Sequence, residues 1–159
     1  KNIDAQVAIN LSVQDVLNED VHSTIINSLH KYQLGGKIVF EIIESEGIEN
    51  YEEISEFISE VKKTGAKISI DDFGTGYSNF EYIMKLKVDY IKIDASMIKD
   101  IDKNVNSQMV TETIIDFAKK MNIKTIAEFV HSETVFNIVK NMGIDFAQGY
   151  HIGKPQKLD

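Results

Sequence analysis

The stretch ISIDDFGTGYS, residues 68–78, places two adjacent carboxylates directly after an apolar run. The residues before Asp71 have the composition of a buried strand, and two glycines follow as turn residues. The carboxylates of Asp71 and Asp72 repel each other, and they are costly to remove from water at the end of a buried strand. Two aspartates at this position therefore indicate a compensating positive charge, such as a metal ion.

Short apolar runs alternate with longer segments of helical spacing on both sides of this stretch. About six strands are expected, at residues 7–11, 38–43, 67–71, 88–93, 123–128 and 146–152. This alternation predicts an α/β fold with a parallel sheet covered by helices. An open doubly wound sheet and an incomplete eight-stranded barrel both agree with this number of strands.

Polar side chains recur at or near the ends of the predicted strands. In chain order they are Asn10, Glu41, Asp71, Asp72, Lys92, Glu128 and Gln148. In a parallel sheet the carboxyl ends of all strands lie on one side, so these side chains can converge. An open sheet would spread them along a line, whereas a barrel gathers them into a ring. Their recurrence in every strand favours a TIM-like (β/α) barrel.

Each of these residues also has a purely structural explanation. A single Asn10 or Asp72 after a strand is commonly a turn former or a helix cap. Lys92 can extend its ammonium group to solvent or pair with Asp94. Glu41 is flanked by apolar residues and needs a partner or a metal ion if it is buried. Together, the polar residues predict an oxygen-ligand site for Mg²⁺ or Mn²⁺.

Composition limits the class of protein. The 159 residues suit one domain, spanning residues 1–159, with a net charge of −8 and no arginine. This charge argues against a DNA or RNA partner, and it leaves metal ions to neutralise any phosphate ligand. The absence of cysteine excludes disulfides. Because no apolar run could span a membrane and no signal-peptide pattern is present, we expect a cytoplasmic protein.

The motifs resemble those of the EAL-domain cyclic-di-GMP phosphodiesterases. They occur in the family's order: AINLS at 8–12, FEIIES at 40–45, DDFGTGYS at 71–78, DYIKID at 89–94, TIAEFV at 125–130 and QGYHIGKP at 148–155. The resemblance implies a TIM-like (β/α) barrel, here incomplete and lacking the N-terminal strands. It also implies hydrolysis of the bacterial second messenger cyclic di-GMP to linear pGpG by a two-metal mechanism.

The resemblance implies a metal-binding role for four residues. Asn10, Glu41 and Asp71 would bind the first of two Mg²⁺ or Mn²⁺ ions. Asp71 would bridge to the second ion, which Asp72 would also hold. Consecutive aspartates can share two ions in this way only if the chain turns between them, and the following glycines permit such a turn.

The resemblance also implies roles for residues around the metals. Lys92 would hold the attacking water or hydroxide, and Glu128 would support the second metal site or act as a base. Glu44 would anchor the loop after Asp72, and Gln148 would help to order the site. The residues that bind the substrate stay unassigned.

The sequence departs from the family pattern in three ways. The Glu-Ala-Leu segment, with a metal-ligand glutamate and a nearby arginine, precedes AINLS in the family and is absent from these residues. Phe129 and His131 replace a glycine and a glutamate, and Phe129 is expected to crowd the mouth of the site. The chain offers about six of the eight barrel strands. We therefore expect little activity from the isolated chain, and association of two copies at the open sheet edges.

Three functions are compatible with these features. The first is hydrolysis of cyclic di-GMP, favoured by the nearly complete set of metal ligands. The second is an EAL-type regulatory module that binds the dinucleotide or a protein partner without cleaving it. The third is an enolase-like Mg²⁺ barrel in which Lys92 abstracts a proton. This third function does not explain the paired aspartates before Gly74.

Overall fold

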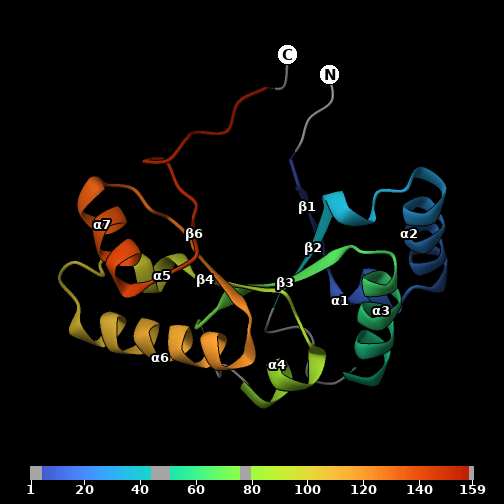
Figure 1. Cartoon of the computed structure of the whole chain (residues 1–159), viewed down its shortest axis with the longest axis horizontal. Coiled ribbons are helices and arrows are strands. Elements are labelled where there is room, and N and C mark those ends of the chain that lie inside the picture. Colours follow the sequence, from blue (N-terminus) through green and yellow to red (C-terminus); the bar gives the residue numbers. More distant parts are fainter. Residues whose placement is uncertain (1–4, 44–50, 76–79, 158–159) are drawn as a thin grey trace. The chain divides into compact units, whose positions relative to one another are not determined.

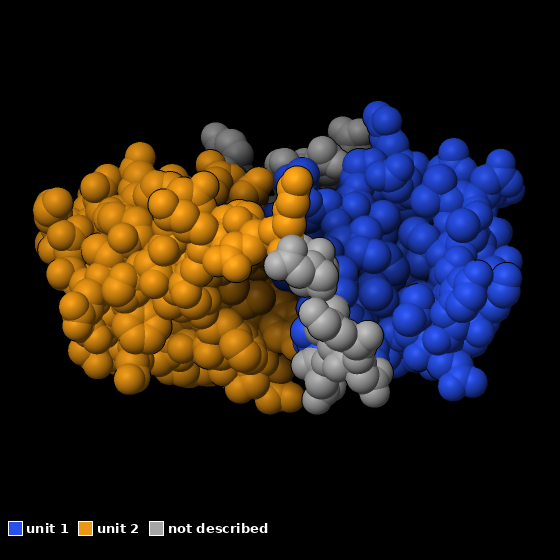
Figure 2. All heavy atoms as spheres, turned by 90° about the horizontal axis from the view of Figure 1, so that it is seen from above, with its two compact units in different colours: residues 1–71, 79–89 blue, residues 72–78, 90–159 orange. Residues whose placement is uncertain are grey.

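The computed structural model describes residues 5–43, 51–75 and 80–157. It divides the chain into two compact units, drawn as a cartoon in Figure 1 and coloured blue and orange in Figure 2. Unit 1 comprises residues 1–71 and 79–89, and unit 2 comprises residues 72–78 and 90–159. The chain first passes from unit 1 to unit 2 at the bond between Asp71 and Asp72. None of the described helices has the length and apolar character needed to cross a membrane.

Unit 1 is built on a parallel sheet in which each strand pairs with the next along the chain. Its strands are β1 (Val7–Leu11), β2 (Ile38–Ile43) and most of β3 (Lys67–Phe73). Its helices are α1 (Val13–Leu17), α2 (Glu19–Tyr32), α3 (Tyr51–Lys63) and α4 (Phe80–Leu86), with a short 3-10 helix at Gly35–Lys37. Helices and strands alternate along the chain, as the sequence predicts (Figure 1).

The two faces of the unit 1 sheet differ in chemistry. Phe40 and its register neighbour Ile68 are buried, and the ring of Phe40 packs edge-on against Phe57 of α3, with centroids 6.2 Å apart. This face meets the helices and forms the apolar core. Alternate strand residues point to the opposite face, so the other face carries Asn10 and Glu41.

Unit 2 contains the end of β3 and three further strands. These are β4 (Tyr90–Ile93), β5 (Lys124–Ala127) and β6 (Phe146–Ala147), which pair in parallel in chain order. The helices are α5 (Ala95–Ile98), α6 (Val105–Met121) and α7 (Glu133–Met142). The backbone N–H of Asp94 donates to Phe73 O at 3.2 Å, which ties the end of β3 to the end of β4.

The predicted length of the last strand is wrong. The sequence predicts a strand over residues 146–152, but β6 ends at Ala147. Gly149 lies so close to the preceding loop that a Cβ atom there would be 2.3 Å from Val130 O. The backbone then turns, with the N–H of Ile152 donating to Gly149 O at 3.0 Å. The apolar residues after β6 therefore belong to a turn that packs on the loop after β5.

One aspartate in each unit fixes the start of a neighbouring strand. In unit 1, Asp89 accepts a hydrogen bond from Ile68 N at 2.9 Å. In unit 2, Asp145 accepts hydrogen bonds from Thr125 N at 3.0 Å and from Lys124 Nζ at 2.6 Å. Both aspartates lie just before the strand that follows them in the chain, and Asp145 sets the alignment of β5 and β6.

Asp145→Asn is expected to destabilise the protein by about 1 kcal/mol at pH 7, because a charge-assisted hydrogen bond becomes weaker. Burial opposes ionisation of the Asp145 carboxyl, but hydrogen bonds from Lys124 and Thr125 outweigh it and hold its pKa below the usual 3.8. A lowered pKa stabilises the fold above that value, and the stabilisation is lost as the pH falls through the folded-state pKa.

The difference in unfolding free energy between wild type and Asp145→Asn should therefore shrink below about pH 4. Urea unfolding at pH 7 and at pH 3 measures this difference, with Asp116→Asn on the exposed face of α6 as the control. An equal loss of stability at both pH values would show that the charge of Asp145 contributes nothing.

Candidate metal and catalytic site

A row of polar side chains crosses the face of the unit 1 sheet that lies opposite the helices. Asn10 of β1 is the register neighbour of Glu41 of β2, and Glu41 is the neighbour of Ser69 of β3. Asp71 lies two residues beyond Ser69, on the same face of the strand. Unit 1 therefore places on one sheet face the three residues that the sequence predicts as ligands of the first metal ion.

Ser69 is a member of this row that the sequence analysis missed. Its side chain is fully buried, and its Oγ has no hydrogen-bond partner among the described residues. A buried hydroxyl of this kind is normally satisfied by a water molecule or a ligand. The signal available in the sequence was a single polar residue inside an apolar strand, at the spacing that places it on the face of Asp71.

The backbone at Asp72 explains how two consecutive aspartates can serve one site. In a regular strand, Asp71 and Asp72 would point to opposite faces. Asp72 instead adopts a φ of 56°, a left-handed conformation that aspartate tolerates better than most residues. Gly74, with a φ of 106°, continues the turn, whereas Gly76 lies outside the described residues. The turn that the two-metal interpretation requires therefore begins at Asp72 itself.

The turn brings Asp72 close to a carboxylate from another strand. Asp72 and Glu128, which follows β5, each offer a carboxylate oxygen within 4.8 Å of the other. Asp71, bonded to Asp72, supplies the third carboxylate of this group. All three residues are partly buried. Closely spaced carboxylates of this kind suit a hard divalent cation, which would offset their mutual repulsion.

Lys92 lies beside this group. Its Nζ is 2.9 Å from Glu128 Oε1, and the two side chains are only 6% and 17% exposed. Lys92 on β4 is the register neighbour of Ile126, so Glu128, two residues further on, projects from the same face. Lys92 does not extend to solvent, and Asp94 accepts a hydrogen bond from Ser96 N as the N-cap of α5.

Gln148 and Glu44 are the two remaining predicted site residues, and the structure describes only Gln148. Gln148 follows β6, and its backbone N–H donates to Ala127 O at 2.8 Å while its carbonyl accepts from Val130 N at 2.9 Å. These bonds hold the loop that carries Glu128, whereas Gln148 itself is exposed. Glu44 lies outside the described residues.

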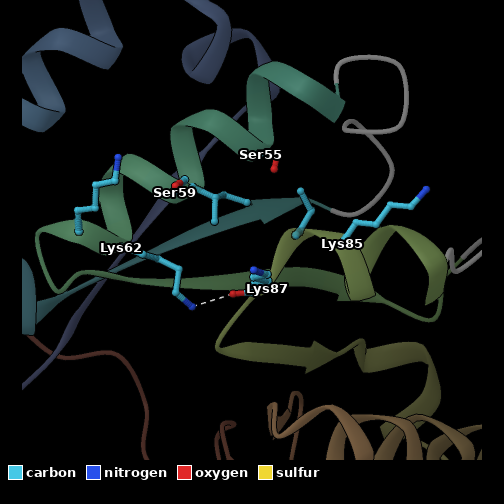
Figure 3. Close-up of a pocket in the computed structure, with 8 residues that line it drawn as sticks. Ser55, Ser59, Lys62, Lys85 and Lys87 are labelled. Carbon is cyan, nitrogen blue, oxygen red and sulfur yellow. Dashed lines mark hydrogen bonds between the residues drawn. The ribbon is translucent and has the colours of Figure 1, made fainter.

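A separate concave surface in unit 1 has a different character. It is a groove of about 550 Å³ between α3 and α4, lined by Ser55, Ile58, Ser59, Lys62, Lys63, Lys85, Leu86 and Lys87 (Figure 3). Lys62 Nζ donates to Lys87 O at 2.7 Å and pairs with Asp89 at 2.9 Å, and Lys85 pairs with Glu81 at 2.6 Å. Figure 3 shows the side chain of Lys85 extending away from Lys62.

The lysines of this groove have a structural explanation. Lys62 and Lys63 lie in the last turn of α3, and Lys85 lies in the last turn of α4. Positive charge at a helix C-terminus is favourable because it complements the helix dipole. The groove has no carboxylate among its lining residues, so it lacks the ligands that the predicted metal site needs.

Comparison with known proteins identifies a family. Residues 1–155 match the EAL domain family. The cyclic di-GMP phosphodiesterase PdeB of Shewanella oneidensis is 33% identical over 153 residues, which cover 96% of this chain and 18% of PdeB. The chain spans about a fifth of the length of the curated relatives it matches.

Solved structures agree with this match. The EAL domain of Mycobacterium smegmatis DcpA superimposes with a TM-score of 0.87 at 26% identity, covering 94% of this chain and 68% of that one. A manganese and cyclic-di-GMP complex of Klebsiella pneumoniae BlrP1 gives a TM-score of 0.83 at 26% identity, covering 91% and 38%. The predicted α/β fold of the TIM-like barrel class and the resemblance to the family are confirmed.

Asp72→Asn is expected to weaken Mn²⁺ binding about tenfold or more, because a hard divalent cation loses a charged oxygen ligand. Electron paramagnetic resonance of free Mn²⁺ during a titration measures the affinity directly. Asp116→Asn, which removes an exposed carboxylate from α6, controls for the general attraction of cations to an acidic chain. Equal affinities for the two variants would mean that Asp72 is not a ligand.

Proposed function

The chain belongs to the EAL domain family, and on this premise we propose that it supplies the catalytic site of a phosphodiesterase that hydrolyses cyclic di-GMP to linear pGpG. The observation that carries the proposal is the carboxylate group of Asp72 and Glu128, next to Asp71 in the chain and beside the buried Lys92. Relatives named as cyclic di-GMP phosphodiesterases support the choice of substrate.

The proposed metal ligands are arranged around the bond between Asp71 and Asp72. Asn10, Glu41 and Asp71 share one sheet face and would hold one divalent ion, Mg²⁺ or Mn²⁺. Asp72 would hold a second ion, with Asp71 as a ligand of both. Bound ions of this type neutralise phosphate charge and lower the pKa of a coordinated water. The manganese in the BlrP1 complex supports the choice of metal.

The residues beside the carboxylates position the nucleophile. The carboxylate of Glu128 holds the Lys92 ammonium at 2.9 Å, in a place where little water competes for it. Lys92 donates a hydrogen bond to the attacking water oxygen, and Glu128 accepts the proton or supports the second ion. Attack at phosphorus forms a bond to the water oxygen and breaks one P–O bond of the ring, and the leaving oxygen takes up a proton to give the linear dinucleotide. The backbone of Gln148 holds the loop of Glu128, and Glu44, which lies outside the described residues, would anchor the loop after Asp72.

One observation favours the alternative of a regulatory module that binds without cleaving. Phe129 directly follows Glu128 and is 54% exposed. A bulky ring next to a proposed catalytic residue restricts how closely a phosphodiester can approach. The two functions share the same ligand and site, so they differ only in whether the bound dinucleotide is hydrolysed.

The complete product of the gene that encodes this chain, incubated with cyclic di-GMP and Mn²⁺, should yield pGpG on ion-exchange chromatography. Asp71→Asn should lower turnover about a hundredfold or more, because the residue that bridges both ions loses its charge. Asp116→Asn is the matched control, since it removes an exposed carboxylate of α6 that lies outside the proposed ligand set. It should retain activity.

The outcomes separate the two functions. Tight binding of cyclic di-GMP without any pGpG would establish the regulatory module and overturn the hydrolase. Near-normal turnover by Asp71→Asn would rule out its bridging role while leaving the hydrolase intact. Absence of both binding and hydrolysis would remove cyclic di-GMP as the ligand.

A further inference from the structure

Phe129 has a backbone conformation that its side chain does not favour. Its φ is 56°, in the left-handed region where a bulky aromatic residue is a genuine outlier. The other described non-glycine residues with positive φ are Gln33, Asp72, Lys87 and Asn122, and none of them is aromatic. Strained backbone of this kind persists only where its surroundings enforce it, and it occurs mostly at functional sites.

Hydrogen bonds on both sides of Phe129 enforce the strain. The preceding residue, Glu128, donates its N–H to Ile93 O at 3.2 Å. The following residue, Val130, is fully buried, donates to Gln148 O at 2.9 Å and accepts from His151 N at 3.0 Å. The loop is therefore fixed at residues 128 and 130, and Phe129 cannot relax without breaking these contacts.

Burial of the Phe129 ring offsets little of the cost of its backbone strain. The residue is 54% exposed, so most of its apolar surface stays in contact with water. Its ring lies beside the His131 ring, with centroids 5.5 Å apart and planes tilted by 49°. His131 Nδ1 is 3.2 Å from Phe129 O, which holds the imidazole against the turn. Packing in the core does not account for a strained phenylalanine at this position.

The place of Phe129 in the chain suggests a role. Consecutive Cα atoms are about 3.8 Å apart, so Phe129 follows directly on the residue whose carboxylate belongs to the candidate site. A ligand whose phosphate lies at the Asp72 and Glu128 carboxylates would bring an attached base within reach of the ring. Aromatic side chains bind flat nucleobases by stacking, and this contact does not depend on the metal.

We propose that Phe129, supported from the side by His131, is a stacking surface for a purine base of the nucleotide bound at the Glu128 site. This proposal rests on the proposed function, because it requires a nucleotide ligand there. It assigns Phe129 to substrate binding and selectivity rather than to the chemical step. The backbone strain is then a stability cost retained for ligand recognition.

Phe129→Gly separates recognition from stability, because the two are expected to change in opposite directions. Glycine accepts a φ of 56° without strain, so the melting temperature should rise by about 2–4 °C. Loss of the ring should weaken cyclic di-GMP binding about tenfold, while Mn²⁺ affinity stays unchanged. The measurements are differential scanning calorimetry, Mn²⁺ titration, and isothermal titration with cyclic di-GMP on the complete gene product, with Ca²⁺ as the metal to slow turnover.

Two further variants complete the test. Asn122→Gly relaxes another left-handed residue, at the end of α6, and should leave dinucleotide affinity unchanged. Phe129→Tyr keeps an aromatic face and should bind the dinucleotide as the wild type does. Unchanged or tighter binding by Phe129→Gly overturns the stacking proposal while leaving the hydrolase in place. A wild-type protein that binds Mn²⁺ but no cyclic di-GMP overturns both proposals.

Discussion

The site depends on one backbone torsion, the positive φ of Asp72. Strand geometry sends successive side chains to opposite faces, and this rule alone would separate Asp71 from Asp72. The left-handed conformation of Asp72 breaks the alternation of side chains near the end of β3. One carboxylate can then belong to the polar row of unit 1 while its neighbour approaches Glu128. Aspartate is suited to this position because its short polar side chain tolerates the conformation.

The sequence predicts the parts of the fold that depend on local patterning. Strands β1 and β2 have the predicted bounds because each is a short apolar run next to clear turn or helix signals. The convergence of Glu41 with Asn10, and of Lys92 with Glu128, follows from the topology of parallel strands. What sequence reasoning missed depends on contacts between distant residues. Strand β6 ends early because Gly149 packs on the backbone of Val130. No sequence pattern near residue 149 predicts that contact.

The sequence also does not show the strain at Phe129 or the hydroxyl of Ser69, which has no hydrogen-bond partner among the described residues. A serine in a strand is commonplace, and only the register shows that Ser69 is the neighbour of Glu41 on the next strand. The φ of Phe129 results from hydrogen bonds made by its two neighbours rather than from its own preference. In both cases the informative quantity is a conflict between a residue and its surroundings, which appears only in three dimensions.

The same positive φ has different energetic costs at Asp72 and at Phe129. Both residues have a φ of 56°, and both lie where a strand gives way to the loop that carries site residues. For Asp72 the cost is small, and the torsion itself redirects a carboxylate. For Phe129 the cost is larger, because the ring gains neither burial nor a regular strand position. A residue that only had to turn the chain would be better as glycine. The presence of a phenylalanine is therefore best explained by what its exposed ring contacts outside the protein.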